Sequence, residues 1–546
     1  GNALRVIDTA TGEVVSEVAT PTGCDPYRWW APGVVAARCW GEHQSLQIWA
    51  IPLDGSAADD ADAVLVLASG HDFYGAPRLG PDGVTVSYIA WDHPQMPWDG
   101  TVLGLREWRL DGAVGDERVL LGGTAESVLQ PEWLDPEHLL CVSDRSGWWN
   151  LHEVGLDGSV RAVCPREEEF AWPLWLAGWT TYTLLDDRRA VVLHGRGCTR
   201  LGVLDLRSGE LVDLPVDAEW HPGLGTDGSR VAGVMASATR PRTVVDVDLS
   251  SGTVEELRSA SSDVPATDVL PLPVKRTFVR DDGQEVHAYV HAPHNGAIEG
   301  PAGERPPFIA IVHGGPTAAA HGILDLEIAY FTSRGIGVVD VDYGGSTGYG
   351  RPYRDLLRGG WGVVDVEDAV AAARHLADAG LVDPARLAIR GGSAGGFTTL
   401  AALCFHDTFA AGTSLYGVAD LSVLAQDTHK FESRYLDGLV GPWPDAADTY
   451  AERSPISHTD GFDRPLLVLH GREDAVVPPA QAEVVVAALA ERGVPHAYVL
   501  FDGEQHGFRR AETLVRALEA ELWFYGRVFG FTPADPVAPV PGAQGL

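Results

Sequence analysis

The sequence predicts a β-propeller of six to seven blades over residues 1–270. It predicts an α/β domain with a mostly parallel, doubly wound sheet over residues 271–546. The chain has 546 residues, and a single hydrophobic core rarely extends beyond about 250–300 residues. Turn dipeptides recur through the first half, whereas apolar strands alternate with amphipathic helices in the second. Fourteen of the 17 tryptophans also precede residue 270, so the halves differ in composition.

The first half consists of short alternating strands that end at turns. Segments such as LQIWAIPLDG and TRLGVLDLRSG run into a turn, and successive turns are separated by 43–57 residues. One four-stranded propeller blade takes roughly 40–50 residues. Additional turns at 81–83 and 226–228 fall between them, as hairpins within a blade require. A β-sandwich array is the alternative, but the repeat length favours a propeller, either a small one or one with an incomplete seventh blade. The six repeated turns are Thr11-Gly12, Asp54-Gly55, Asp111-Gly112, Asp157-Gly158, Ser208-Gly209 and Ser251-Gly252.

The second half has the alternation that is typical of a parallel α/β sheet. Helices are predicted over 365–379 and 480–492, where apolar residues recur at three- and four-residue steps. The boundary with the first half is expected near 271–273, and the Pro-rich residues from 533 onward are expected to be extended. Strands are predicted over 308–313, 337–343, 386–390, 410–416 and 465–470.

The charge of the chain restricts its partners. Forty basic and 76 acidic side chains give a formal net charge of −36. Phosphate backbones are bound by clustered Lys and Arg, so nucleic acid is not expected as a partner, and neither is an anionic membrane surface. No apolar run reaches the roughly 20 residues of a membrane helix, and no signal segment opens the sequence. High solubility is the simplest consequence of this charge.

The six cysteines do not have the spacing of a metal site. None forms a CxxC pair, and most lie in apolar or strand-like segments. We therefore expect reduced thiols, a cytoplasmic location and no bound metal. The alternative is a disulfide between Cys24 and Cys39 in an exported protein.

The segment RLAIRGGSAGGFTTLAALC predicts a strand, a tight turn and a helix. Residues 391–395 match G-x-S-x-G, in which a serine occupies a strained strand-to-helix turn and its neighbours must lack a Cβ atom. This turn exposes the Ser393 hydroxyl and places the amide of Ala394 at a helix N-terminus, where partial positive charge stabilises an oxyanion. The sequence therefore predicts a nucleophilic Ser393 in an α/β-hydrolase domain.

A nucleophilic serine requires a base, and an acid that orients the base, in the chain order Ser, Asp, His. Asp474 follows the strand PLLVLH and is predicted as the acid, with its neighbour Glu473 as the competitor. His506 lies in a glycine-containing loop before the last helix and is predicted as the base. His470 is the rival histidine, but it precedes the acid, so we expect it to shape the loop instead.

The segment HGGP at 313–316 directly follows the first long strand of the second half. Glycines at this place allow a backbone amide to face the reacting carbonyl, so the amides of Gly315 and Ala394 are predicted to form an oxyanion hole. A plain turn is the alternative. The glycine-rich segment 344–350 lacks both the lysine of a phosphate-binding loop and the dinucleotide spacing, so no cofactor is expected.

Together these motifs resemble the prolyl oligopeptidase family of serine peptidases. A propeller followed by HGGP, GGSAGG, HGREDAVVP and GEQHGF is most similar to its bacterial acylaminoacyl-peptidase and dipeptidyl-aminopeptidase-like branch. Residues 342–351, 361–370 and 427–441 also resemble this branch, and the resemblance is most specific over 308–510. It implies hydrolysis of short peptides, usually near their N-terminus, with the propeller covering the active site.

In the resembling enzymes, the segment DTHKFESRYLDG helps to form the pocket for the side chain before the scissile bond. Phe431 and Tyr435 are four residues apart and would share a helix face, so we expect them to line this pocket with Val477. Glu432 is expected to pair with a free α-amino group of the substrate. The alternative is that Phe431 and Tyr435 are core residues and that Glu432 binds an arginine such as Arg434.

We expect a serine exopeptidase with an aminopeptidase-like preference, which cleaves short peptides or aminoacyl amides through an acyl-enzyme. Acylaminoacyl-peptidase action is the first alternative. An amidase or esterase for an aminoacylated small metabolite, such as an antibiotic, is the second. A propeller binding protein with a vestigial hydrolase domain is the alternative from a different class. Formation of a homo-oligomer is left open.

Overall fold

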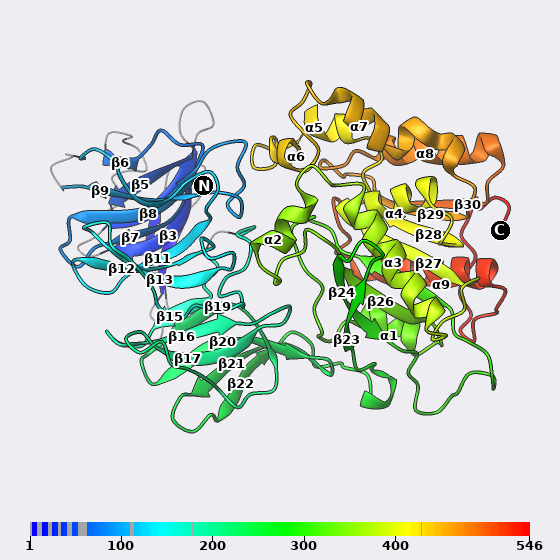
Figure 1. Cartoon of the computed structure of the whole chain (residues 1–546), viewed down its shortest axis with the longest axis horizontal. Coiled ribbons are helices and arrows are strands. Elements are labelled where there is room, and N and C mark those ends of the chain that lie inside the picture. Colours follow the sequence, from blue (N-terminus) through cyan, green and yellow to red (C-terminus); the bar gives the residue numbers. More distant parts are fainter. Residues whose placement is uncertain are drawn as a thin grey trace.

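The computed structural model has two parts that follow one another along the chain (Figure 1). Short antiparallel sheets form the first part, and one large mixed sheet flanked by helices forms the second. The chain is therefore a β-propeller followed by an α/β-hydrolase domain, as the sequence predicts. The residues that the structure describes are 3–7, 14–19, 24–30, 34–40, 46–52, 60, 63–109, 114–176, 178–426 and 428–546.

Within these residues the propeller has five four-stranded sheets and one two-stranded sheet, β1 (Ala3–Ile7) with β2 (Val14–Ala19). Strands that follow one another in the chain pair within each sheet, which is the arrangement of a propeller blade. The four-stranded blades are β3 (Cys24–Trp30), β4 (Val34–Trp40), β5 (Leu46–Pro52) and β6 (Leu65–Ala68); β7 (Phe73–Leu79), β8 (Thr85–Trp91), β9 (Val102–Glu107) and β10 (Arg118–Gly122); β11 (Val128–Trp133), β12 (His138–Ser143), β13 (Asn150–Gly155) and β14 (Val160–Ala162); β15 (Tyr182–Leu184), β16 (Arg189–His194), β17 (Arg200–Asp205) and β18 (Leu211–Asp213); and β19 (Glu219–Thr226), β20 (Arg230–Ser237), β21 (Arg240–Asp248) and β22 (Val254–Ser259).

The repeated turns join the third strand of a blade to the fourth. Between β17 and β18, for example, Asp205 Oδ1 accepts hydrogen bonds from the two amides at positions 207 and 208, and Gly209 has a φ of 74°. This conformation favours glycine, which explains why glycine recurs at these turns. The turns expected at 11–12, 54–55 and 111–112 lie outside the described residues. The described turns of the series are Asp157-Gly158, Ser208-Gly209 and Ser251-Gly252.

The α/β-hydrolase domain is built on one eight-stranded sheet in the order β23-β24-β26-β25-β27-β28-β29-β30. Six of these strands are parallel, and β24 pairs antiparallel with both β23 and β26. Each strand predicted from an apolar segment is present, to within two residues at either end. The strands are β23 (Val274–Val279), β24 (Glu285–His291), β25 (Phe308–Val312), β26 (Gly337–Asp342), β27 (Leu387–Gly392), β28 (Ala411–Leu415), β29 (Leu466–Gly471) and β30 (His496–Phe501).

Helices cover both faces of this sheet. On one face, α1 and α9 enclose an apolar layer that includes Ile309, Val338 and Phe524, while α3, α4 and α8 pack on the other face. The helices predicted over 365–379 and 480–492 correspond to α3 and α8. The helices are α1 (Leu326–Thr332), α2 (Arg351–Arg354), α3 (Val364–Asp378), α4 (Ala394–Phe405), α5 (Leu421–Gln426), α6 (Tyr435–Leu439), α7 (Ala447–Arg453), α8 (Pro479–Arg492) and α9 (Ala511–Phe529), with 3₁₀ turns η4 (Thr267–Val269), η5 (Asp355–Leu357) and η6 (Pro455–Gly461).

The link between the two parts runs from residue 260 to residue 273. The last propeller strand, β22, ends at Ser259, and the first strand of the large sheet, β23, begins at Val274. The boundary expected between residues 270 and 271 falls inside this link, where it stays a prediction.

The Pro-rich residues from 533 onward, which were expected to be extended, include a bend and a turn, and they pack against the hydrolase domain. Val540 is only 3% exposed, although its segment has no regular secondary structure. The backbones of Gln544 and His496 exchange two hydrogen bonds, at 2.9 and 3.0 Å. Residue 544 is therefore paired with the start of β30.

A buried ion pair joins the two domains. Asp144 follows the propeller strand β12, and its side chain has no exposed surface. Its Oδ2 accepts hydrogen bonds from Arg351 Nη1 at 2.7 Å and from Arg354 Nη2 at 2.6 Å, both on α2 of the hydrolase domain. The Arg354 guanidinium also lies 4.1 Å from the centre of the Trp149 ring. A buried carboxylate with two arginine partners thus fixes α2 on the propeller.

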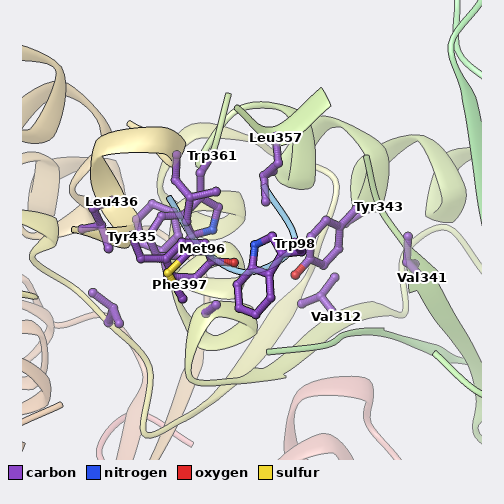
Figure 2. Close-up of a cluster of buried hydrophobic side chains, with 14 of the residues drawn as sticks. Met96, Trp98, Val312, Val341, Tyr343, Leu357, Trp361, Phe397, Tyr435 and Leu436 are labelled. Carbon is purple, nitrogen blue, oxygen red and sulfur yellow. The ribbon is translucent and has the colours of Figure 1, made fainter. Parts of the chain in front are cut away.

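The domains also share apolar packing. Met96 and Trp98 come from the segment that follows β8 in the propeller, and each is 1% exposed. Figure 2 shows both side chains among buried residues of the hydrolase domain, including Tyr343, Trp361 and Tyr435. One apolar cluster therefore continues from one domain into the other.

Replacing Asp144 with Asn is expected to lower the free energy of unfolding by about 3–5 kcal/mol, because the buried Arg354 loses its counter-charge and Arg351 loses one of its two carboxylate partners. Urea denaturation followed by tryptophan fluorescence measures the change. Asp407→Asn is the matched control, since its carboxylate is 85% exposed and its pair with Arg374 contributes at most about 1 kcal/mol. Equal losses in the two variants would contradict a structural role for the buried pair.

Candidate active site

Ser393 lies in a sharp turn between β27 and α4. Its backbone has φ 55° and ψ −118°, which is strained for a residue with a Cβ atom. Close packing explains the flanking glycines: a Cβ atom on Gly391 would lie 2.3 Å from the carbonyl oxygen of Gly395, and one on Gly395 would lie 2.1 Å from that of Val312. The G-x-S-x-G pattern therefore meets a steric requirement of this turn.

The three side chains predicted to act together form one hydrogen-bonded chain. His506 lies in the loop between β30 and α9, with its Nε2 2.8 Å from Ser393 Oγ. Its Nδ1–H donates to Asp474 Oδ2, also at 2.8 Å. This bond holds the imidazole in the tautomer whose Nε2 can accept the serine proton.

Asp474 is held in its ionised form. Its side chain is buried, and its Oδ1 accepts hydrogen bonds from the amides of Val476 and Val477, both at 2.9 Å. Burial opposes the charge, but interactions with the histidines at 470 and 506 outweigh it, so the pKa of Asp474 lies well below its usual value. Glu473, the competing acid, is exposed to solvent, and His506 bonds to Asp474 instead.

His470 shapes the loop that carries Asp474, as expected. It is fully buried, and its Nε2–H donates to the carbonyl oxygen of Val477 at 2.9 Å. The same nitrogen lies 3.4 Å from Asp474 Oδ2. His470 thus closes the turn after β29, while the contact with Ser393 is made by His506.

The segment 313–316 runs alongside the nucleophile turn. A Cβ atom on Gly314 would lie 3.5 Å from the Cβ of Ser393. Gly315 has a φ of 121°, which favours glycine, and a Cβ atom there would lie 2.9 Å from the Thr317 nitrogen. Among the described residues, the amides of Gly315 and Ala394 donate no hydrogen bond to the protein. Both are therefore free to stabilise an oxyanion.

The glycine-rich segment 344–350 supports this arrangement. His313 stacks on Tyr343, with ring centres 4.3 Å apart, and its Nε2 lies 2.7 Å from Ser346 Oγ. Burial lowers the pKa of His313 to about 4, so its ring is neutral at pH 7. The glycine-rich segment 344–350 thus helps to hold the candidate oxyanion hole in place, and the sequence already indicated that it is not a phosphate site.

Two propeller tryptophans contact the same region, and sequence reasoning missed both. Trp175 Nε1–H donates to the carbonyl oxygen of Thr317 at 2.7 Å. Trp98 packs on it, with ring centres 4.5 Å apart. The only signal in the sequence was the high tryptophan content of the first half, which we used to divide the chain.

Phe431 and Tyr435 lie against these tryptophans, but they do not share a helix. The expectation of a common helix face is wrong, because α6 begins at Tyr435 and Phe431 lies in the turn before it. Both rings nevertheless have centres 6.0 Å from that of Trp175. The Tyr435 hydroxyl accepts a hydrogen bond from the Thr317 amide at 3.1 Å, so this tyrosine also supports the segment that follows Gly315.

Glu432 is paired within its own segment. Its Oε2 lies 3.3 Å from His429 Nε2, whereas Arg434, the alternative partner, pairs with Asp437. Val477 is 1% exposed, and its amide donates to the acid of the site. Binding of substrate by Phe431, Glu432, Tyr435 and Val477 stays a prediction.

The described residues contain no group of three or more His, Cys, Asp or Glu side chains that is placed to bind a metal ion. In the same part of the chain, none of the helices combines the length and the apolar character needed to cross a membrane. The expected pairing of Cys24 and Cys39 concerns side chains outside the described set, although the register of β3 and β4 places the two positions opposite each other.

Comparison with known proteins identifies relatives of both domains. Residues 323–532 match the prolyl oligopeptidase family. The solved structure of a puromycin-hydrolyzing peptidase from Mycobacterium tuberculosis is 49% identical, with a TM-score of 0.93, and the match covers 96% of this chain and 82% of that one. A solved puromycin hydrolase is 46% identical, with a TM-score of 0.89 and coverage of 96% and 81%.

Curated relatives match a smaller share of the chain. Dipeptidyl aminopeptidase BIII from Pseudoxanthomonas mexicana is 30% identical over 286 residues, which is 51% of this chain. The chain spans 41% of the length of that enzyme.

Replacing Asp474 with Asn is expected to lower kcat by about 10⁴-fold, because His506 would lose the partner that fixes its tautomer and stabilises its cation. Glu473→Gln is the matched control and should leave kcat within about twofold, since its side chain is exposed. Turnover of an activated ester and of an amino acid p-nitroanilide gives both values. Loss of activity in Glu473→Gln together with retained activity in Asp474→Asn would instead assign the orienting acid to Glu473.

Proposed function

The chain belongs to the prolyl oligopeptidase family of serine peptidases, and we propose that it hydrolyses amide bonds in short peptides or aminoacyl amides. One observation carries the proposal: Ser393, His506 and Asp474 form a continuous hydrogen-bonded chain beside two unoccupied backbone amides. This combination of nucleophile, oriented base and oxyanion donors is what acyl transfer requires.

In the proposed reaction, Ser393 Oγ attacks the substrate carbonyl carbon while His506 Nε2 takes the hydroxyl proton. The amides of Gly315 and Ala394 stabilise the oxyanion that forms. The C–N bond then breaks, and His506 returns its proton to the leaving amine. Water then attacks the acyl-enzyme carbonyl carbon while His506 takes its proton. His506 returns this proton to Ser393 Oγ, and the carboxylic acid product is released. Asp474 stays ionised throughout and stabilises the imidazolium.

The propeller restricts which substrates reach the site. Trp175 binds the carbonyl of Thr317, two residues beyond Gly315, and Lys430 of the hydrolase domain lies 3.3 Å from the propeller carboxylate of Asp72. We therefore expect both domains to enclose the proposed active site, since clefts between domains are a common location for a selective pocket. Short peptides and small aminoacyl compounds fit this arrangement, whereas folded proteins do not.

Aminopeptidase action on a free N-terminus is the preferred form of the activity. Relatives named as a dipeptidyl aminopeptidase and as puromycin-hydrolyzing enzymes support it, and the latter also support an aminoacyl antibiotic as a substrate. Acylaminoacyl-peptidase action is the second candidate, because a curated relative named as an acylamino-acid-releasing enzyme also matches part of the chain. A propeller binding protein with an inactive hydrolase domain is disfavoured, because the hydrogen-bonded chain at Ser393 is intact.

A free α-amino group is expected to raise kcat/KM at least tenfold. The measurement compares Phe- and Pro-p-nitroanilide with their N-acetyl forms, and puromycin with N-acetylpuromycin. Ser393→Ala should remove all turnover and all labelling by a fluorophosphonate probe. Equal or faster cleavage of the acetylated compounds would instead indicate an acylaminoacyl-peptidase.

Glu432→Gln tests the residue expected to bind this amine. Because Glu432 is already paired with His429, an incoming ammonium must share its carboxylate. The variant should lose most of the preference for the free amine while it keeps its activity on acetylated substrates. An unchanged preference would clear Glu432 of this role.

Substrate size is expected to limit the rate sharply. Peptides of a few residues should be cleaved, while native albumin and casein should stay intact over hours, because both domains enclose the site. Mass spectrometry of the digests gives the cleavage products. Rapid fragmentation of either protein would contradict the proposed restriction.

A further inference from the structure

A cavity of about 230 Å³ lies between the propeller and the hydrolase domain. The propeller contributes the link between β14 and β15, the segment around Cys198, and Glu219 at the start of β19. The hydrolase domain contributes residues 318–321 and 347–348. The residues proposed to bind, attack and protonate the substrate are not among those that line it.

This cavity adjoins the candidate oxyanion hole. Ala318 lines the cavity, and its Cβ lies 3.3 Å from the place of a Cβ atom on Gly315. Trp175 also lines the cavity and is fixed by its hydrogen bond to the Thr317 carbonyl. A substrate whose carbonyl oxygen is bound by the Gly315 amide would therefore lie close enough for one of its own side chains to reach the cavity.

Aromatic rings form much of the cavity wall. Trp172, Trp175 and Trp179 all line it, and apolar residues fill most of the remaining wall. The Trp172 ring stacks on His321, with ring centres 4.9 Å apart and an interplanar angle of 12°. Tryptophan faces attract cations more strongly than other aromatic rings do.

The wall carries two acidic side chains, Glu219 and Glu169. Glu219 is 9% exposed, and its Oε1 accepts a hydrogen bond from His321 Nδ1–H at 2.5 Å. Its Oε2 has no hydrogen-bond partner in the described part of the chain. Glu169 also lines the cavity, but its two carboxyl oxygens already accept hydrogen bonds from the amides of Trp149 and Gly350.

The lysine close to this wall is already engaged. Lys275 lies behind Gly197, where its Nζ donates to the carbonyl of Arg196 at 2.6 Å. Its ammonium also lies 5.1 Å from the centre of the Tyr349 ring. Neither Lys275 nor Arg196 lines the cavity. The wall combines aromatic faces with two carboxyl groups, and His321 is the only basic side chain among the described residues that line it.

We propose that this cavity is a subsite for a basic side chain of the substrate, an arginine or lysine close to the scissile bond. The tryptophan faces would hold the alkyl stem and the cation, and the free oxygen of Glu219 would pair with its charge. The volume favours a whole side chain over an isolated ammonium group, since one water occupies only about 30 Å³ of liquid. This inference rests on the proposed function, whose substrate class it narrows.

The test compares kcat/KM for short peptides in which one position near the scissile bond holds arginine, citrulline, norleucine or glutamate. Citrulline retains the shape of arginine without its charge. At one position, arginine should be preferred to citrulline at least tenfold, and glutamate should be the poorest. Glu219→Gln should reduce this preference to about twofold or less while the norleucine peptide keeps its kcat/KM. Trp172→Leu should weaken the preference in the same direction.

Glu137→Gln is the matched control, because this glutamate is exposed on the propeller, and it should retain the full preference. Cleavage of norleucine peptides without a preference for arginine at any position would overturn the subsite and leave the proposed function intact. No cleavage of any peptide would count against the proposed function itself. A preference that survives in Glu219→Gln would place the cation elsewhere.

A second readout does not depend on turnover. Cys198 lines the cavity and is exposed, so iodoacetamide should modify it. In the Ser393→Ala protein, arginine amide should slow this alkylation at least fivefold, as measured by peptide mapping, and norleucine amide at the same concentration should not. No slowing by either amide would contradict the subsite, and equal slowing by both would contradict its preference for a cation.

Discussion

The buried carboxylate of Asp144 is the interaction on which the relation between the two domains depends. A charge removed from water is stable only with close partners, and those partners, Arg351 and Arg354, lie on the other domain. The pair therefore fixes the position of α2 on the propeller. The loop that precedes α2 continues this link, because its residues bind His313 and the carbonyl of Ala318 on either side of the candidate oxyanion hole. One connected set of hydrogen bonds thus joins the two domains and positions the residues around the candidate oxyanion hole.

Most of the fold and the central residues of the site could be predicted from the sequence, because their causes are local. The glycines around Ser393 reflect a steric conflict with backbone only a few residues away or on the adjacent strand. The turns of the propeller follow from Asp side chains and glycine conformations within a few residues. Chain order then distinguished His506 from His470, and the hydrogen bonds at both histidines agree with that choice.

The surroundings of the site could not be predicted, because their causes are distant in the chain. Trp175 lies 142 residues before the carbonyl that it binds, and no local pattern marks that pairing. The helix expected to carry Phe431 and Tyr435 begins only at Tyr435, since the preceding turn is held by contacts with the propeller at Lys430. Glu432 is likewise engaged by His429, a partner that its spacing alone did not single out.

The pairing of Gln544 with His496 has a consequence for association between molecules. β30 is the last strand of the eight-stranded sheet, so one side of its backbone has no strand beside it. An open strand edge is a template for another chain, and natural proteins commonly cover it. Here the final residues of the sequence lie along the beginning of that edge and bond to it, while Val540 anchors them in the apolar layer below α9. A segment with little regular structure of its own therefore covers the start of a strand edge that could otherwise pair with another chain.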